Sequence, residues 1–443
     1  MLSKGFGKLS TIFTPLLLLL LLVLLLEEEG VSRARRFSTV KIRVQKDSFL
    51  KGWLMAERCA ATSDALPVLT SILCSFGPEQ ITMESTDLKT SVRWKIPVSS
   101  LEMGDAFQLL LPSKTAGELL RKIPGETFFL EIRDGKAVFH VDRSRYRLTL
   151  FPVDSFPKLQ SSQNATVLGS CSVEELRRLL EKGTFAGSIN EEFPQYISGA
   201  CFSINGQDMA VATTDTRRLA LARGTISREE DSARQVVLPV RGLRELQKIL
   251  AGCDAQGSVS LALDDAQAYF GLPEGEFSIR RMEAHFPPYE NLLSIEGATR
   301  VVINKKNIME ALERLDVVVR NHTRVVVLDL SDTQGCRMTG QAPDVGTATE
   351  TVEAEVTGSS LRVAFNVRFL LEGLKALEGN TALMNFNGSL GHLLISSAEH
   401  EDYSYIIMPV TLAEDDQRTA DEGDLQNEGS EELSGSSDVS ETK

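Results

Sequence analysis

The feature that most constrains the fold is a repeat, because one order of strands and helices occurs three times along the chain. Each of three segments opens with an alternating strand that runs into an amphipathic helix. A second helix follows later in each segment, where a strand end and a small polar turn introduce it. The anchors before the second helices, Pro112, Pro239 and Asn366, lie 127 residues apart in both steps. A constant period of this length indicates one structural unit used three times in tandem.

Each repeat is predicted to hold two helices and several short strands. The first helices are expected over residues 48–59, 172–182 and 305–315. The second helices are expected over residues 115–123, 241–250 and 368–377. Between them lies a matched strand, at 81–87, at 210–215 and, more weakly, at 336–344. Many short strands with few helices indicate an α+β domain in which an antiparallel sheet carries the helices on one face.

The segment before the repeats begins with Lys4 and Lys8 and contains the apolar run 16–26. This pattern is typical of a signal peptide, but Glu27 and two further glutamates stand where a small-x-small cleavage site belongs. The run is also shorter than the roughly 20 residues of a membrane span. Because domain patterning begins abruptly at Val40, two interpretations remain: a start codon assigned too far upstream, or a genuine extension.

The segment after the repeats is acidic. Residues 413–443 carry 11 acidic and 2 basic side chains, a net charge of −9, and few large apolar residues. Such a segment cannot bury enough apolar surface to offset its ordering entropy, so we expect a disordered tail. The predicted organisation is an extension, three domains and the tail: 1–39, 40–164, 165–297, 298–412 and 413–443.

The net charge of −14 is unevenly distributed. Setting aside the −9 of the tail and the +2 of the first 38 residues leaves −7 for the repeats. Every expected helix still carries basic residues on its polar side. They are Lys51, Arg58, Arg121, Lys122, Arg177, Arg178, Lys182, Arg241, Arg244, Lys248, Lys305, Lys306, Arg314, Arg368 and Lys375. Solvated charge explains any single helix, whereas repetition over six helices favours a shared surface that binds phosphates without reading bases.

Several stretches resemble a known family. The segment 212–220, Ala-Thr-Thr-Asp-Thr-Arg-Arg-Leu-Ala, is similar to the motif Ala-Thr-Asp-Gly-His-Arg-Leu-Ala of the bacterial DNA polymerase III beta subunit, the replicative sliding clamp. The other similar stretches are 143–146, 156–159, 286–289, 365–367 and 405–410. The resemblance covers residues 40–412, which is essentially all three repeats.

The resemblance implies a ring. Three clamp domains per chain and two chains arranged head to tail give a six-domain homodimer that encircles double-stranded DNA without sequence specificity and slides along it. The implied partners are the polymerase III alpha subunit, the clamp loader and other proteins with a clamp-binding motif. The implied protein is cytoplasmic, needs no cofactor and is a non-catalytic subunit of the polymerase holoenzyme.

The resemblance also implies a peptide-binding pocket between the second and third domains. Carried over position by position, it consists of Tyr196, Ile197, Thr214, Arg218, Leu219, Pro287, Leu292, Asn366, Phe369, Met408, Pro409 and Val410. The alternative is that apolar members such as Leu219 are core residues. Thr216 and Arg217 replace the Gly-His of the family motif, and Asn291 replaces a frequent pocket arginine, so partner preference is expected to differ.

No catalytic pattern is evident. The sequence contains no phosphate-binding loop, no His-Glu-x-x-His and no Gly-x-Ser-x-Gly elbow. The carboxylates Asp215, Asp264 and Asp265 are predicted to occupy turns, and the six cysteines and five histidines lack metal-ligand spacing. Two other classes stay open: a surface-anchored repeat adhesin, which the leucine run suits, and a nucleic-acid-processing enzyme with an unrecognised site.

Overall fold

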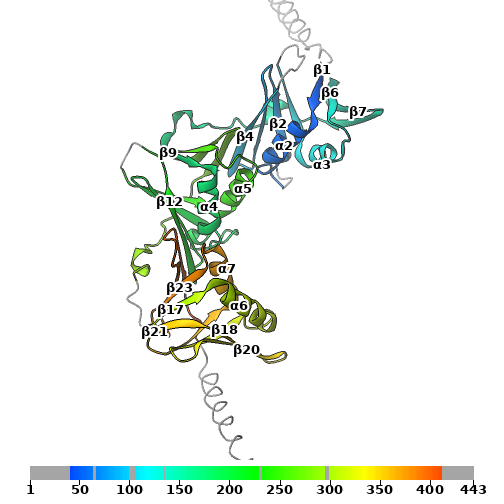
Figure 1. Ribbon diagram of the computed structural model, residues 1–443. Coiled ribbons are helices and arrows are strands. Elements are labelled where there is room, and N and C mark those ends of the chain that lie inside the picture. The colour runs from blue at the N-terminus through cyan, green and yellow to red at the C-terminus, as the bar shows by residue number, and fades with distance from the viewer. Residues whose placement is uncertain are drawn as a thin grey trace, which may run out of the picture. The chain divides into compact units, whose positions relative to one another are not determined.

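The computed structural model describes residues 40–62, 66–98, 106–133, 135–228, 232–294 and 299–411. The expected extension, the acidic tail and Leu412 lie outside the described residues. The chain divides into two compact units (Figure 1). Unit 1 runs to Leu159 without the short stretch Leu88–Ser91, and unit 2 contains that stretch and the chain from Gln160 onward.

Unit 1 is the first repeat. Its helices are α2 (Lys46–Glu57) and α3 (Ser113–Lys122). One sheet has the order β1-β6-β7-β8, formed by Val40–Gln45, Thr127–Arg133, Lys136–Val141 and Ser144–Thr149. A second run of strands has the order β5-β2-β3-β4, formed by Phe107–Pro112, Ser71–Phe76, Gln80–Thr86 and Thr90–Pro97. The helices pack on an aromatic core in which Phe49 lies 6.0 Å from Trp53 and 5.7 Å from Phe128, measured between ring centroids.

Unit 2 contains the second and third repeats. The second repeat has helices α4 (Val173–Gly183) and α5 (Val240–Leu250). Its strands are β9 (Thr166–Ser172), β10 (Gly199–Asn205), β11 (Asp208–Thr214), β12 (Arg218–Thr225), β13 (Arg234–Pro239), β14 (Ser258–Leu263), β15 (Gln267–Leu272) and β16 (Gly275–Arg280). Strands β9, β14, β15 and β16 pair antiparallel in that order.

The third repeat has helices α6 (Lys305–Val319) and α7 (Val367–Ala376). Its strands are β17 (Thr299–Asn304), β18 (Val325–Ser331), β19 (Gly335–Ala342), β20 (Gly346–Val352), β21 (Ala354–Gly358), β22 (Leu361–Asn366), β23 (Thr381–Phe386), β24 (Leu393–Ser397) and β25 (Tyr403–Ile407). Strands β20, β19, β18 and β22 form a separate four-stranded sheet.

One nine-stranded antiparallel sheet joins the second and third repeats, in the order β13-β10-β11-β12-β25-β24-β23-β17-β21. The joint is the pairing of β12 with β25, in which Leu219 stands opposite Ile406 and Ala220 opposite Tyr405. The main core of the third repeat also buries Ala186 and Ala220 of the second. Figure 1 shows α4, α5, α6 and α7 on the same side of unit 2. The two repeats therefore share a sheet and a core.

All six predicted helices are confirmed within a few residues, because each has an apolar stripe that packs on the sheets. The strand expected more weakly at 336–344 is present as β19. The residues after β19 form two strands, β20 and β21, and β21 pairs with the far edge of β17. Over the described residues, no helix is long and apolar enough to cross a membrane. The six cysteines are free thiols.

A buried ion-pair network ties α4 to the third repeat. The Lys182 ammonium lies 2.6 Å from an Asp402 carboxylate oxygen and 2.8 Å from one of Glu378. Asp402, in the turn before β25, also accepts from Arg178, whose guanidinium binds Glu175. Lys182 is only 4% exposed. A cation this buried is stable only while its carboxylate partners stay in place.

Replacing Asp402 with Asn is expected to lower the free energy of unfolding of unit 2 by about 2 kcal/mol, because Lys182 and Arg178 lose a shared counter-charge. Urea denaturation followed by far-UV circular dichroism measures the change. Asp332→Asn is the matched control, since Asp332 is exposed in the turn between β18 and β19. Equal midpoints for the two variants would show that the network contributes nothing.

Candidate functional site

The best-defined polar group at the joint is the Arg218 guanidinium. Its Nε donates to Asp215 at 2.9 Å, one Nη donates to Glu372 of α7, and its plane lies 4.3 Å from the Phe369 ring centroid. The side chain is 10% exposed. Burial alone lowers the pKa of an arginine, but the Glu372 carboxylate helps to outweigh it and the pKa stands above its ordinary value. Arg218 therefore stays charged and is bound by carboxylates within the chain.

The turn before Arg218 is held by its own side chains. One Asp215 oxygen accepts from the backbone N–H groups of Arg217 and Arg218, both at 3.1 Å. Thr214 donates its hydroxyl to the Arg218 carbonyl at 2.7 Å and accepts from the Thr216 N–H at 3.1 Å. Thr216 has a φ of +74°, in the left-handed region that favours glycine. Asp215 thus has the turn role predicted for it.

The chain that leaves β25 runs beside this turn. Met408 donates its N–H to the Arg217 carbonyl at 2.8 Å, and Val410 donates to the Ala364 carbonyl of β22 at 2.8 Å. The side chains of Met408 and Val410 are 43% and 37% exposed. Arg217, Arg218, Phe369, Met408 and Val410 are called the joint patch below. It combines exposed apolar groups with two arginines at the meeting point of two repeats.

A second group of predicted residues packs at the same joint, on the face of β12 to which Leu219 belongs. The Tyr196 ring contacts Phe286, which contacts Tyr289, at centroid distances of 6.3 and 5.9 Å. Tyr289 and Phe286 pack with Leu219 of β12 and with Ile406 of β25. Leu292 follows in the short 3-10 helix Glu290–Leu292 and is 38% exposed. Pro287, directly after Phe286, is half-buried.

The structure therefore brings the predicted pocket residues to one joint, although not all of them can touch a ligand. Ile197 and Leu219 are 7% and 5% exposed, so they form the floor, which agrees with the core alternative for these two residues. Asn366 accepts from the Arg368 N–H at 3.0 Å and caps α7, so its side-chain oxygen has a structural partner. Pro409 is half-buried between the exposed Met408 and Val410. The contactable part is narrower than the sequence predicts.

Three residues of this site, Glu372, Phe286 and Tyr289, were not predicted as site residues from the sequence. Glu372 and Phe369 hold Arg218 from α7, but only Phe369 was predicted. Phe286 and Tyr289 link Tyr196 to the core and were noted only as part of a motif. Glu372 follows Arg368 by four residues and binds it at 2.7 Å, and this spacing is the one sequence signal for its position.

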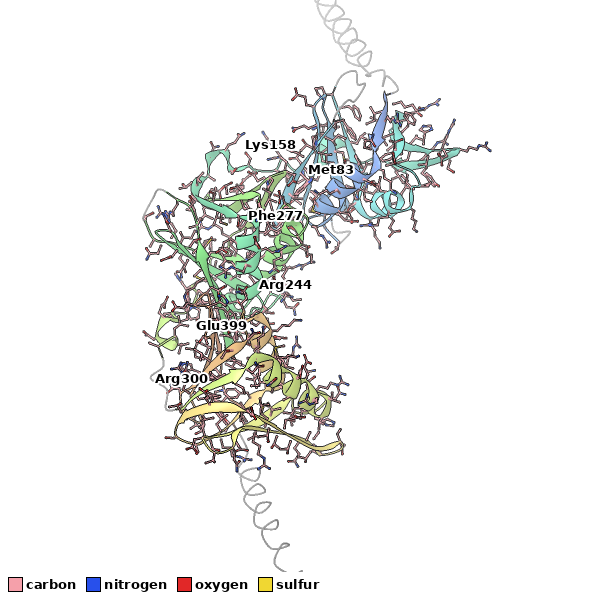
Figure 2. The ribbon with its side chains drawn as sticks, in the orientation of Figure 1. Met83, Lys158, Arg244, Phe277, Arg300 and Glu399 are labelled. Atoms are coloured by element: carbon pink, nitrogen blue, oxygen red, sulfur yellow. The ribbon has the colours of Figure 1, made fainter. Side chains whose placement is uncertain are left out.

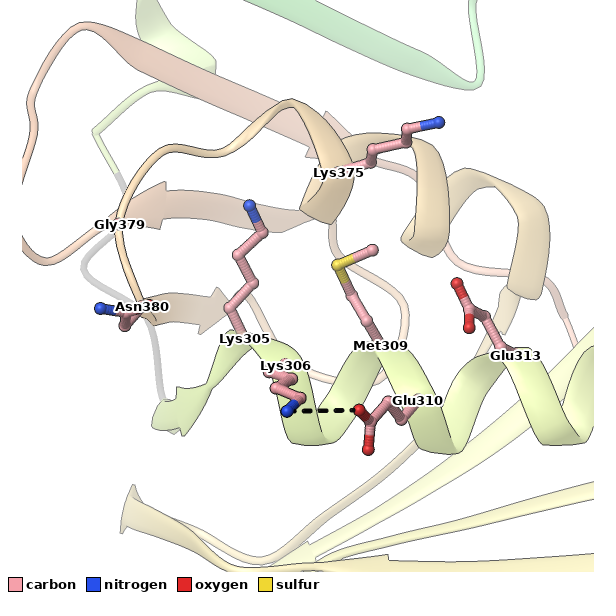
Figure 3. Close-up of a pocket in the computed structure, with 8 residues that line it drawn as sticks. All are labelled: Lys305, Lys306, Met309, Glu310, Glu313, Lys375, Gly379 and Asn380. Atoms are coloured by element: carbon pink, nitrogen blue, oxygen red, sulfur yellow. Dashed lines mark ion pairs between the residues drawn. The ribbon is translucent and has the colours of Figure 1, made fainter.

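A hollow lies elsewhere, between α6 and α7. It has a volume of about 380 Å³ and is lined by Lys305, Lys306, Met309, Glu310, Glu313, Lys375, Gly379 and Asn380. Figure 3 shows lysines reaching it from both helices, with Met309 between them. Lys306 lies 3.9 Å from Glu310, and Lys305 donates to the Leu377 carbonyl. Its lining therefore combines three lysines with two glutamates and one methionine.

Most of the predicted basic residues are exposed, but two are not available to a ligand. Lys182 is buried and Arg178 is held by Glu175 and Asp402, so their assignment to a DNA-facing surface is wrong. A neighbouring repeat covers the polar side of α4 at these positions. Exposed members with a carboxylate partner are Arg121, Lys248, Lys306, Arg314 and Arg368.

The remaining basic residues have no carboxylate within ion-pair distance among the described residues. The exposed ones are Lys51, Arg58, Lys122, Arg177, Arg241 and Lys375, whereas Arg244 and Lys305 are half-buried. Figure 2 shows Arg244 on the helix side of unit 2 and Arg300 on the opposite side, along β17. The unpaired cations lie on or directly beside the helices.

No arrangement in the described residues suggests catalysis or metal binding. No group of three or more His, Cys, Asp or Glu side chains there could hold a metal ion. Asp264 accepts from the backbone N–H groups of Ala266 and Gln267 at 2.8 and 2.7 Å, and from the Tyr269 hydroxyl at 2.6 Å. These contacts give Asp264 the predicted turn role.

Comparison with known proteins gives a consistent result for each of the three repeats. Models of the N-terminal, central and C-terminal domains of the DNA polymerase III beta subunit match residues 40–160, 170–288 and 291–411. A beta sliding clamp of Pseudomonas putida is 25% identical over 372 residues, covering 83% of this chain and 99% of the relative. One of Synechococcus elongatus is 26% identical over 354 residues, covering 78% and 92%.

Solved structures agree with the sequence relatives. The crystal structure of a DNA polymerase sliding clamp from Bacillus subtilis has a TM-score of 0.80 at 22% identity, and it covers 85% of this chain and 100% of that one. The sliding clamp of Pseudomonas aeruginosa bound to griselimycin has a TM-score of 0.79 at 23% identity, with coverage of 85% and 100%. The three-domain clamp fold is therefore shared along the full length of these proteins.

Thr216→Gly is expected to raise the free energy of unfolding by about 1 kcal/mol, because glycine adopts a positive φ without the steric cost of a side chain. Chemical denaturation measures it. Arg217→Gly is the control, since Arg217 is not among the positive-φ residues and glycine there is expected to be neutral or destabilising. A loss of stability in Thr216→Gly equal to that of the control would contradict the strain at Thr216.

Proposed function

Because the chain belongs to the family of the DNA polymerase III beta subunit, the bacterial sliding clamps, we propose that it encircles duplex DNA, slides along it and tethers the replicative polymerase. The observation that carries the proposal is the match of all three repeats, in order, to the three domains of that subunit. The family is a processivity factor, so the chain is a non-catalytic member of the holoenzyme. Its place of action is the cytoplasm, with the domain boundaries 40–164, 165–297 and 298–412.

The joint within unit 2 supports closure of a ring from two copies. At that joint, β12 pairs with β25. Strand β12 is the last of the antiparallel run β10-β11-β12 in the second repeat, and β25 is the last strand of the third repeat. The equivalent strands elsewhere are β20 in the third repeat and β8 in the first, and both stand at the ends of their sheets. An unpaired edge strand offers backbone donors and acceptors to another strand. Pairing of β20 with β8 of a second copy repeats the same joint and gives a head-to-tail dimer.

The register of this second joint follows from the first. Tyr146 of β8 is equivalent to Tyr405 of β25. Each stands opposite an apolar residue of the preceding strand, Phe139 for Tyr146 and Ile395 for Tyr405. Ala348 of β20 is likewise equivalent to Ala220 of β12. Ala348 stands opposite Gly340 of β19, and Ala220 stands opposite Thr213 of β11. Since Ala220 pairs with Tyr405, Ala348 is expected to pair with Tyr146 of the second copy.

The helix side of the repeats is the proposed DNA surface. Four helices lie on one side of unit 2, and unpaired cations such as Arg177, Arg241 and Lys375 are exposed on them (Figure 1). Phosphate contacts of this kind give salt-sensitive affinity without sequence information, as a sliding protein needs. The lysine-lined hollow between α6 and α7 extends the same surface. The contacting set is the predicted one without Arg178 and Lys182.

The joint patch, with Tyr196, Pro287 and Leu292, is the proposed peptide-binding site. Exposed apolar side chains beside fixed polar groups are typical of sites that bind short peptide motifs, and a methionine adapts to varied partners. The partners proposed for it are the polymerase III alpha subunit, the clamp loader and other proteins with a clamp-binding motif.

After treatment with a clamp loader and ATP, the protein is expected to remain on closed circular DNA through a gel-filtration column and to leave the same DNA after linearisation. Topological linkage, unlike a bound site, ends when a sliding ring reaches a free end. Retention on neither form would refute the clamp, and equal retention on both would indicate an ordinary DNA-binding protein. DNA turnover by the purified chain alone would favour a processing enzyme, and export to the cell surface an adhesin.

A Tyr146→Cys, Ala348→Cys double variant is expected to form intermolecular disulfides under mild oxidation, because the two side chains face each other across the proposed joint. Non-reducing electrophoresis detects a covalently closed dimer. The wild-type chain controls for its own six cysteines. A Tyr146→Cys, Thr349→Cys variant, displaced by one residue, is expected to cross-link less, and equal yields would reject the register.

A further inference from the structure

The joint patch contains two neighbouring arginines with opposite surroundings. Arg218 is 10% exposed and is bound by Asp215, Glu372 and the Phe369 ring. Arg217 is exposed, and no carboxylate of the described residues pairs with its side chain. The nearest acid in the sequence, Asp215, uses one oxygen for two backbone N–H groups and the other for Arg218. Arg217 is therefore the free cation of the patch.

The backbone of Arg217 is held on both sides. Its N–H donates to Asp215 at 3.1 Å, and its carbonyl accepts from Met408 at 2.8 Å. The first contact fixes the turn, and the second places Arg217 directly beside the exposed Met408. A cation whose backbone is already ordered loses less entropy when it binds a ligand than one on a mobile loop.

We infer that the peptide site of this chain selects segments in which a carboxylate lies next to large apolar side chains, with Arg217 as the residue that binds the carboxylate. The inference rests on the proposed function and specifies the partner chemistry of its peptide site. Apolar partner residues would cover Met408, Val410 and Leu292, which are 43%, 37% and 38% exposed. An acidic partner residue would then meet Arg217 at the edge of a partly desolvated contact, where a charged pair gains strength.

The charges around the patch agree with this assignment. Glu372 is committed to Arg218 and to Arg368, and these hydrogen bonds keep its pKa below the ordinary value although burial acts the other way. Glu290 accepts from the Tyr289 backbone N–H at 3.0 Å. Neither carboxylate is bound to Arg217, so an incoming carboxylate does not have to displace one from it. A partner with a lysine or arginine at this position is disfavoured by like charge.

The test begins with a phage-displayed library of random dodecapeptides, selected in parallel against the full wild-type chain, Arg217→Gln and Met408→Ala. Peptides selected by the wild type and lost with Met408→Ala define binders of the peptide site. Among these, Asp or Glu is expected to be enriched at a constant distance from Leu, Met or Phe residues. The Arg217→Gln pool is expected to keep the apolar positions and to lose the acidic one.

One selected peptide and its Glu→Gln or Asp→Asn twin then give affinities by fluorescence polarisation. The exchange is expected to weaken binding to the wild type by about fivefold and to change binding to Arg217→Gln by less than about twofold. Arg217→Lys should restore most of the difference, because it keeps the charge. Arg300→Gln, which removes an exposed arginine from β17, should behave as the wild type.

The outcomes separate the inference from the function on which it rests. The role of Arg217 would be overturned if the Met408-dependent peptides showed no acidic enrichment, or if the enrichment persisted in the Arg217→Gln pool. Either result would still support the peptide site. An absence of any Met408-dependent peptide would overturn the peptide site itself. Retention on circular DNA tests the clamp independently of both.

Discussion

Antiparallel pairing of edge strands is the interaction on which the rest of the structure depends. A meander that ends in an exposed strand is incomplete, because a row of backbone donors and acceptors stays open. In unit 2, the pairing of β12 with β25 closes one such edge and fuses two repeats into a nine-stranded sheet. The ion pairs of Lys182 and Arg178 with Asp402 then fix α4 against the same strand end. Of the strands equivalent to β12 and β25, β20 and β8 still stand at sheet edges among the described residues, and in the proposed ring a second copy pairs with both.

The distribution of charge follows from that architecture. A chain with a net charge of −14 can present a cationic surface only if its basic residues are gathered on one side. In unit 2, α4, α5, α6 and α7 lie on one side and carry exposed basic residues such as Arg177, Arg241 and Lys375 (Figure 1). Carboxylates bind several of these cations, as Glu350 binds Arg314 through two 2.8 Å contacts. The surface is therefore moderately rather than strongly basic, which suits sliding better than tight static binding.

The sequence was sufficient to predict the helices, but it was insufficient to predict which of their side chains other parts of the chain bury. Apolar periodicity and the 127-residue step located all six helices and the three-repeat fold, because both depend on local pattern. The same pattern assigned Lys182 to an exposed face, and that assignment failed because burial of this side chain depends on Asp402, which is 220 residues away. Ile197 and Glu372 illustrate the same limit. Strand register between distant segments decides whether a side chain is buried beneath a binding site, exposed at its edge or held in an internal ion pair. The periodicity of a local segment does not contain this information.

In the proposed peptide site, the two neighbouring arginines at the joint divide structure and recognition between them. Arg218 is the structural member, since its contacts to Asp215, Glu372 and Phe369 bind the second repeat to α7 of the third. Arg217 contributes to the joint only through its backbone, by accepting from Met408. Its side chain can therefore change without breaking a contact that holds the repeats together. Partner preference in such a protein can diverge at residue 217 while residue 218 remains under structural constraint, which separates the evolution of specificity from that of stability.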